Sequence, residues 1–133
     1  MTGFSIQLRD SSGAERIEAV SAFVGEDSSG SFGILADHAR FMTALVVGLA
    51  RFRIEAQPWQ YLAVPGALLY FRDNLLTIIT RHYLRGDDYH RIVTALEQQL
   101  LAEEEALRAT KQSLHRMEEE ILRRMWGLGR RGA

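Results

Sequence analysis

The sequence predicts an antiparallel β-sandwich over residues 1–86, followed by a C-terminal α-helical domain over residues 87–133. Residues 1–86 are punctuated by glycine and rich in β-branched and aromatic residues, and turn signals recur without any helical period between them, which is typical of a sandwich or barrel. By contrast, residues 87–126 contain neither glycine nor proline, and their apolar residues recur at alternating steps of three and four. That spacing indicates a helix with an apolar stripe.

The predicted strands follow from alternation and from turn residues. Residues 4–8 alternate apolar and polar side chains, which predicts a half-buried first strand, and a second apolar run covers residues 17–24. Residues 25–31 have the composition of a surface loop, and Asp73-Asn74 fits a tight two-residue hairpin turn. The remaining predicted strands are residues 32–35, 43–47, 49–54, 59–64, 67–72 and 75–80.

The helical segment starts after Gly86, where Asp87 or Asp88 is expected to cap the first turn. Its apolar positions fit a heptad seam that two polar residues interrupt, Glu103 and Thr110. This interruption leaves two shapes open: a helical hairpin that turns near residues 104–112, or one continuous helix roughly 60 Å long. The seam consists of Tyr89, Val93, Leu96, Leu100, Leu107, Leu114, Met117 and Ile121.

Composition excludes several kinds of function. The net charge of −1 gives no electrostatic basis for binding nucleic acid or acidic lipid. The absence of cysteine excludes disulfides, thiol catalysis and zinc–thiolate sites. The first residues show no signal peptide, and no apolar run approaches the length that spans a bilayer, so we expect any membrane association to come through a partner.

No motif in the sequence carries catalytic chemistry. The glycine-containing residues 25–33 lack the lysine and the following Ser/Thr of a phosphate-binding loop and precede a strand, so a solvated turn explains them better. The four histidines have no metal-ligand spacing, and acidic helix capping accounts for residues 87–90 without a metal. We therefore expect a non-catalytic protein with no cofactor and no metal.

Four segments, in order along the chain, carry a resemblance to a known family. They are residues 30–45 (GSFGILADHARFMTAL), 61–67 (YLAVPGA), 74–79 (NLLTII) and 85–88 (RGDD). Together they resemble the epsilon subunit of F-type ATP synthases, in which a glycine-acid-x-glycine turn leads to a short apolar strand, a Pro-Gly-His-Ala corner and a Thr-x-Leu run. The resemblance covers essentially the whole chain.

The resemblance implies a non-catalytic central-stalk subunit of a proton- or sodium-translocating complex. Its sandwich would bind the gamma subunit and rest on the membrane rotor (c) ring, and its helices would fold beside the sandwich or extend along gamma and restrain ATP hydrolysis. It also implies a peripheral location at the cytoplasmic face of the bacterial inner membrane, without direct insertion into the membrane.

The same resemblance assigns the candidate interface residues. Ser31, His38 and Arg40 would lie on loops that face gamma or the rotor ring. The residues expected to line the hairpin seam or a gamma-facing stripe are Leu100, Leu107, Leu114, Met117 and Ile121. The residues expected to contact an acidic surface of the catalytic beta subunit are Arg116, Arg123 and Arg124.

This sequence departs from the family pattern at three places. Ala36-Asp37 replaces the Pro-Gly before His38, and Ser31 replaces the acid of the loop, which indicates a diverged or alternative subtype such as a sodium-translocating one. Residues 92–95 (IVTA) occupy the stretch in which some family members carry an ATP-binding motif, so we expect no ATP site.

Two other hypotheses remain open from the residues alone. The first is a self-assembling adaptor whose long helix forms a homodimeric coiled coil, which would make the isolated chain a dimer instead of a monomer. The second is a small-molecule-binding β-sandwich enzyme, which requires a pocket with convergent titratable groups.

Overall fold

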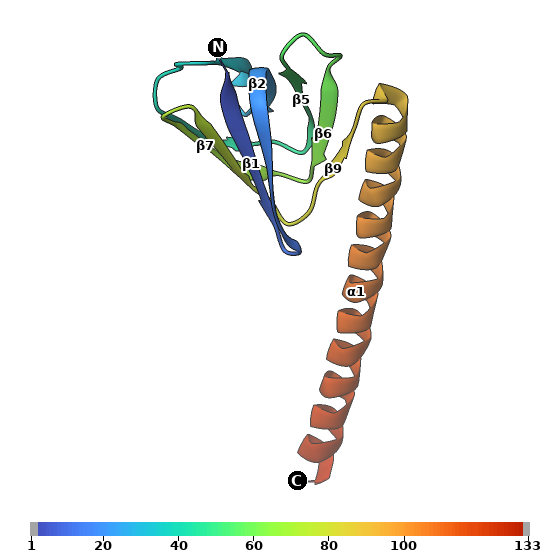
Figure 1. The fold of residues 1–133 in the computed structure, drawn as a ribbon. Helices are drawn as coiled ribbons and strands as arrows, with labels where there is room; N and C mark the ends of the chain where they lie inside the picture. The colour runs from blue at the N-terminus through green and yellow to red at the C-terminus, as the bar shows by residue number, and fades with distance from the viewer. Residues whose placement is uncertain (1–2, 132–133) are drawn as a thin grey trace. The chain divides into compact units, whose positions relative to one another are not determined.

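The computed structural model describes residues 3–131, with side chains for residues 3–127, as nine strands followed by one long helix (Figure 1). The chain divides into two compact units, the first ending at Leu96 and the second beginning at Glu97. The elements are β1 Phe4–Asp10, β2 Gly13–Asp27, β3 Gly30–Leu35, β4 Phe41–Leu45, β5 Gly48–Ile54, β6 Gln60–Val64, β7 Ala67–Arg72, β8 Leu75–Ile79, β9 Leu84–Gly86 and α1 Tyr89–Arg131.

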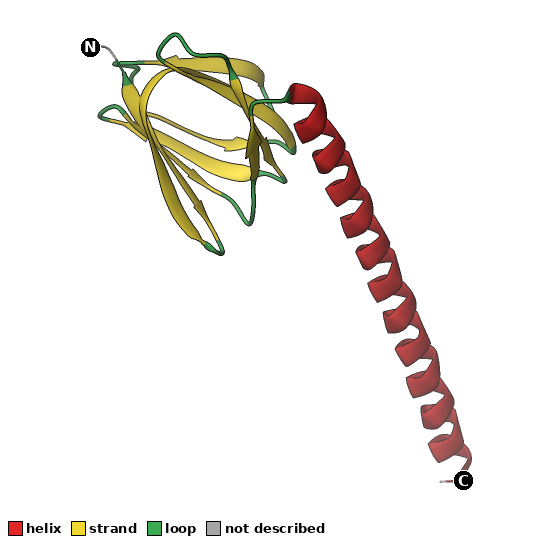
Figure 2. Cartoon of the chain, turned by 45° about the vertical axis from the view of Figure 1, so that its right-hand side comes forward, coloured by secondary structure: helices red, strands yellow, loops and turns green. Residues whose placement is uncertain are grey.

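The long strand β2 joins the two halves of the sandwich. The strands are hydrogen-bonded in the order β1-β8-β7-β4-β2-β5-β6-β9, with β3 on β2, and β1 also pairs with β2. The first part of β2 pairs with β1 and the second part with β3 and β5. Between these parts lies Ala19 at φ 58°, and the register of β2 against β5 shifts between Val20 and Ala22. Such a bulge bends a strand, so that β2 contributes to both layers. Figure 2 shows the curved strands of the sandwich.

The core fills the space between the layers with alternate side chains of each strand. Phe4 and Phe71 meet edge to face, with ring centroids 5.5 Å apart. The predicted sandwich is therefore confirmed, but one pairing differs from a fully antiparallel fold, because β1 and β8 run parallel. The largest fully buried side chains are Phe23, Phe52, Phe71, Ile6, Leu8, Ile34, Leu62, Leu69, Leu76, Ile78, Val20 and Val64.

Two predicted turns have different outcomes. Asp73 and Asn74 have φ of 51° and 58° and connect the paired residues Arg72 and Leu75, as expected of a two-residue hairpin. The prediction of a loop over residues 25–31 is wrong, since β2 continues to Asp27 and β3 starts at Gly30. The composition was misleading because Gly25 is a buried strand residue and not part of a loop. Glycine is needed there because a Cβ would lie 2.9 Å from Cε1 of Phe23.

The helix begins as predicted and takes the longer of the two expected shapes. Asp88 caps it, since its Oδ1 accepts a hydrogen bond of 3.2 Å from the backbone N–H of Arg91. The helix is continuous through residues 104–112, so no hairpin turn forms there. Thr110 satisfies its hydroxyl locally by donating to the carbonyl of Ala106 at 2.9 Å. The three-residue strand β9 was not predicted.

Candidate partner-binding surfaces

The turn before Ser31 is fixed by one carboxylate. Oδ1 of Asp27 accepts hydrogen bonds from the hydroxyl and the backbone N–H of Ser29, and Oδ2 accepts one of 2.7 Å from the hydroxyl of Thr43 on β4. These bonds, that of the Ser29 hydroxyl first, hold the pKa of Asp27 below its ordinary value of 3.8. The turn is thereby tied to β4, and the exposed Ser31 follows it.

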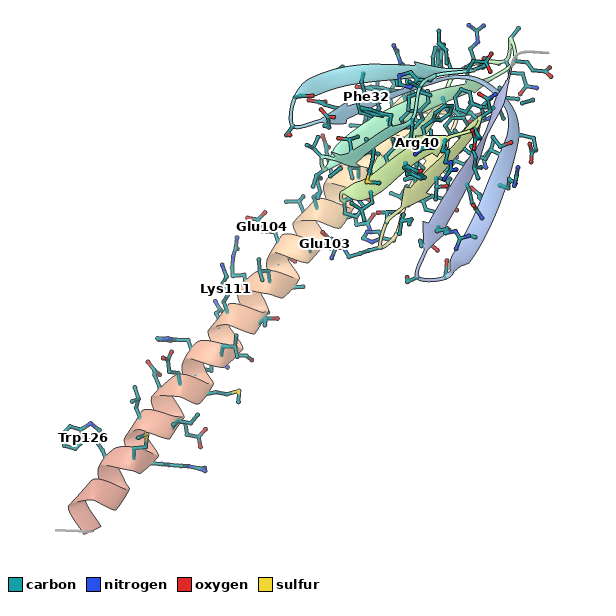
Figure 3. The ribbon with its side chains drawn as sticks, turned by 90° about the vertical axis from the view of Figure 1, so that its left-hand side faces the viewer. Phe32, Arg40, Glu103, Glu104, Lys111 and Trp126 are labelled. Carbon is teal, nitrogen blue, oxygen red and sulfur yellow. The ribbon has the colours of Figure 1, made fainter. Side chains whose placement is uncertain are left out.

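The corner that carries His38 and Arg40 is held by two hydrogen bonds between Asp37 and Asn74. Asp37, at φ 64°, donates its N–H to Oδ1 of Asn74 at 2.7 Å, and Nδ2 of Asn74 donates to Oδ1 of Asp37 at 3.0 Å. The His38 ring lies edge-on to Phe71, with centroids 5.8 Å apart. Arg40 is exposed beside this corner (Figure 3).

The structure brings His38 and Arg40 together and places Ser31 apart from them. Ser31 lies near the start of β3 and borders a recess of about 210 Å³ that Tyr61 and Tyr89 also line. His38 and Arg40 lie beyond the other end of β3 and border a recess of about 420 Å³ together with Arg72. A single partner loop that touches all three predicted residues would have to extend along β3.

The recess that His38 and Arg40 border is also lined by two carboxylates, those of Asp37 and Asp73. Within residues 3–127, no cluster of three or more His, Asp or Glu side chains is arranged to hold a metal ion. The carboxyl groups of Asp10, Glu18 and Asp27 have lowered pKa values, and hydrogen bonds within turns or between neighbouring strands account for each of them.

An exposed apolar surface on β4, β7 and β8 was missed by the sequence analysis. Leu68 is paired with Ala44 on one side and with Ile79 on the other, so these three side chains form one row across the strands. Met42 and Tyr70 form the neighbouring row. Met42, Leu68 and Ile79 are 71%, 61% and 49% exposed, respectively. We call Met42, Ala44, Leu68, Tyr70 and Ile79 the outer patch.

A signal for the outer patch is present in the sequence. Residues 67–71 and 75–79 are apolar at nearly every position, whereas a strand with one wet face alternates apolar and polar residues. Leu69 and Ile78 face the core and are fully buried, so their apolar neighbours Leu68 and Ile79 must face outward. Exposed apolar surface of this kind marks interaction sites in soluble proteins.

The five seam residues from Leu100 onward have exposed side chains, whereas Val93 and Leu96 are half-buried. Leu100 is 37% exposed, and Leu107, Leu114, Met117 and Ile121 are between 55% and 59% exposed. The side chains of Glu104, Lys111 and Trp126 stand out from the helix (Figure 3).

The predicted arginines lie on the same exposed part of the helix as the seam. Arg116, Arg123 and Arg124 are all exposed, and Arg124 forms an i,i+4 ion pair of 2.9 Å with Glu120. An exposed pair of this kind contributes only about 0.3–0.5 kcal/mol to stability, so Arg124 can exchange Glu120 for a partner's carboxylate at little cost.

Comparisons with known proteins point to one family. The family model of the ATP synthase delta/epsilon chain, beta-sandwich domain, matches residues 6–86. The chain is 32% identical over 95 residues to ATP synthase epsilon chain 2 of Cereibacter sphaeroides. The aligned residues cover 71% of this chain and 65% of that relative. It is 37% identical over 84 residues to ATP synthase epsilon chain 2 of Paraburkholderia xenovorans, covering 62% of this chain and 58% of that one.

A solved structure has the same fold. It belongs to the mitochondrial ATP synthase of Euglena gracilis (OSCP/F1/c-ring), with a TM-score of 0.56 at 19% identity over 70% of this chain and 61% of that chain. The matched sandwich contains the outer patch and the turns of Ser31 and His38, and the match to the family model extends from β1 to the end of β9. The chain therefore belongs to the family of ATP synthase delta/epsilon chains.

Proposed function

We propose that this chain is the non-catalytic epsilon-type subunit of a rotary F-type ATP synthase, located in its central stalk. Membership of the family supports the proposal, and the outer patch is the observation on which it depends most. Met42, Leu68 and Ile79 are exposed and do not contribute to the core of the sandwich. Burying these apolar side chains against a partner is favourable.

The proposed occupant of the outer patch is the gamma subunit of the same complex. The turns of Ser31 and of His38 and Arg40 are proposed to contact gamma or the rotor (c) ring. No helix within the described residues is long and apolar enough to cross a membrane. Association with the cytoplasmic face of a bacterial inner membrane is accordingly proposed to come through these partners.

The docking proposal is tested by measuring the affinity of the full chain for purified gamma. Leu68→Asp places a charge at the centre of the outer patch, and we expect it to weaken binding at least about tenfold, because a charge would be buried without a partner. Ala56→Asp is the control, since Ala56 is exposed in the turn between β5 and β6, outside the outer patch and outside β3 and its turns. Equal affinity of the Leu68→Asp variant and the wild type would refute docking through this face.

The second part of the proposal is that the helix restrains ATP hydrolysis in the assembled complex. The exposed stripe of Leu107, Leu114 and Ile121 would lie along gamma, and Arg116, Arg123 and Arg124 would contact an acidic surface of the beta subunit. Glutamine in place of the three arginines should raise the hydrolysis rate of the complex, whereas Lys111→Gln on the same helix should not. An unchanged rate in the triple variant would exclude the inhibitory role of these arginines.

The coiled-coil adaptor is the competing proposal. The exposed seam favours it, but a homodimer through this seam would have to bury Glu103 and Thr110 at core positions, which is costly. Light scattering on the isolated full chain separates the two, because the stalk subunit should be a monomer and the adaptor a dimer.

A further inference from the structure

The first turn of α1 is packed against the sandwich. Ile92 is only 6% exposed, and a Cβ built on Gly86 would lie 3.0 Å from Cδ1 and 3.3 Å from Cγ1 of Ile92. The ring of Tyr89 meets that of Tyr61 edge to face, with centroids 5.3 Å apart. Tyr61 and Gly86 are direct partners in the pairing of β6 with β9, so both contacts fall on the same short stretch of this strand pair.

The outer face of β6 is covered at this place. Leu62 and Val64 are buried in the core, so Ala63 between them points to the other face of the strand, and yet it is only 2% exposed. An outward-facing residue of a two-layer sandwich is normally wet. The compact unit that contains the sandwich continues to Leu96 and therefore includes the first two turns of the helix.

We propose that residues 89–96 are a fixed part of the sandwich, and that the segment free to change its shape or its partner begins at Glu97. Gly86 then makes room for Ile92, because a Cβ there would require the Ile92 side chain to shift by a few tenths of an ångström. Its φ lies outside the left-handed region, so contact with Ile92, not backbone strain, opposes a substitution. The regulatory consequence, that any inhibitory motion of the helix starts beyond Leu96, rests on the proposed function; the anchoring itself does not.

Hydrogen exchange on the isolated full chain tests the anchoring. Amides of residues 93–96 and of residues 100–126 donate to the same kind of i−4 carbonyl, so helix formation alone gives them similar protection. Packing on the sandwich adds protection to the first group only. We expect amides 93–96 to exchange about tenfold or more slower than those of residues 100–126. Equal exchange in the two segments of the wild type would overturn the proposal.

Substitutions at the contact sharpen the test. Ile92→Ala removes the buried side chain, and we expect the exchange of residues 93–96 to rise about tenfold while β1, β7 and β8 are unaffected. Gly86→Ala should produce a smaller change in the same direction. Leu107→Ala, at a residue that is 56% exposed, is the matched control and should leave residues 93–96 unchanged. An Ile92→Ala variant that folds but exchanges like the wild type would refute the anchor.

The two proposals fail in distinguishable ways. Exchange of the isolated chain involves no partner, so a failed anchor appears there whatever the complex does. If the helix has no inhibitory role, the arginine variants leave ATP hydrolysis unchanged while residues 93–96 stay protected.

Discussion

The sandwich buries its large aromatic side chains, whereas the helix beyond Glu97 leaves its large apolar side chains exposed. Within the sandwich, Phe23, Phe52 and Phe71 are completely buried, and every strand pairs with at least one other. In the helix from Leu100 to Trp126, every large apolar side chain is at least 37% exposed. The sandwich therefore contains the interactions that stabilise it, whereas the helical segment presents a surface that gains stability only when something covers it.

The largest expected difference comes from equivalent truncations in the two regions. Phe71→Ala should lower the free energy of unfolding by about 3–5 kcal/mol, because it removes a buried ring that contacts Phe4 and leaves a cavity. Leu114→Ala, at a side chain that is 59% exposed, should change it by less than about 0.5 kcal/mol. Urea denaturation of the isolated chain measures both. Similar losses in the two variants would mean that the helical stripe is already covered in the free chain.

A smaller effect is expected at the hairpin turn of the sandwich. Asn74→Ala and Asn74→Gly both remove the hydrogen bonds to Asp37, but only alanine opposes the φ of 58° at this position. Alanine should therefore cost about 1 kcal/mol more than glycine in urea denaturation. Equal stabilities would show that the backbone conformation of the turn is not the constraint.

In the helix, Gly127→Ala should stabilise only the turns around the substituted residue. A Cβ at this position meets no atom within 4 Å, so the change adds helix propensity without a clash. It should stabilise the last turns by up to about 1 kcal/mol, seen as slower exchange of their amides, and leave the unfolding of the sandwich unchanged. A shift in the unfolding of the sandwich would contradict the independence of the two regions.

The smallest effect concerns the turn before Ser31 and depends on pH. The folded pKa of Asp27 is lowered, so the stability that its ionised form contributes is fully present above the ordinary value of 3.8 and is lost as the pH falls through the folded value. Asp27→Asn should therefore be less stable than the wild type at neutral pH, and the difference should shrink below pH 3.8. Denaturation at several pH values measures it, and a difference independent of pH would contradict the role of the charge.

The sequence predicted the elements whose signal is local. Alternation located the strands, the Asp73-Asn74 pair located a hairpin, and an aspartate at the start of the helix was expected to cap it. Local signals could not locate the parallel pairing of β1 with β8, because the strands that pair lie far apart in the chain. They also failed for β9, which has three residues and is held mainly by pairing with β6.

The candidate interface was only partly accessible from the sequence. Ser31, His38 and Arg40 were selected as a group, but β3 separates Ser31 from the other two. The outer patch was missed because apolar residues on both faces of a strand are usually assigned to the core. The choice between a hairpin and a continuous helix depended on residues 104–112, which lack a strong helix breaker and remain helical.

Hydrogen exchange of the helix in the free chain and in the assembled complex tests most directly whether residues 100–126 form a partner-binding surface. Their amides should exchange fast in the isolated chain and at least about tenfold more slowly after assembly, because a covered stripe must open before its amides exchange. Amides of the buried core strands should change little. Equally fast exchange of residues 100–126 in both states would contradict the account, because the apolar stripe would then have no partner in the complex.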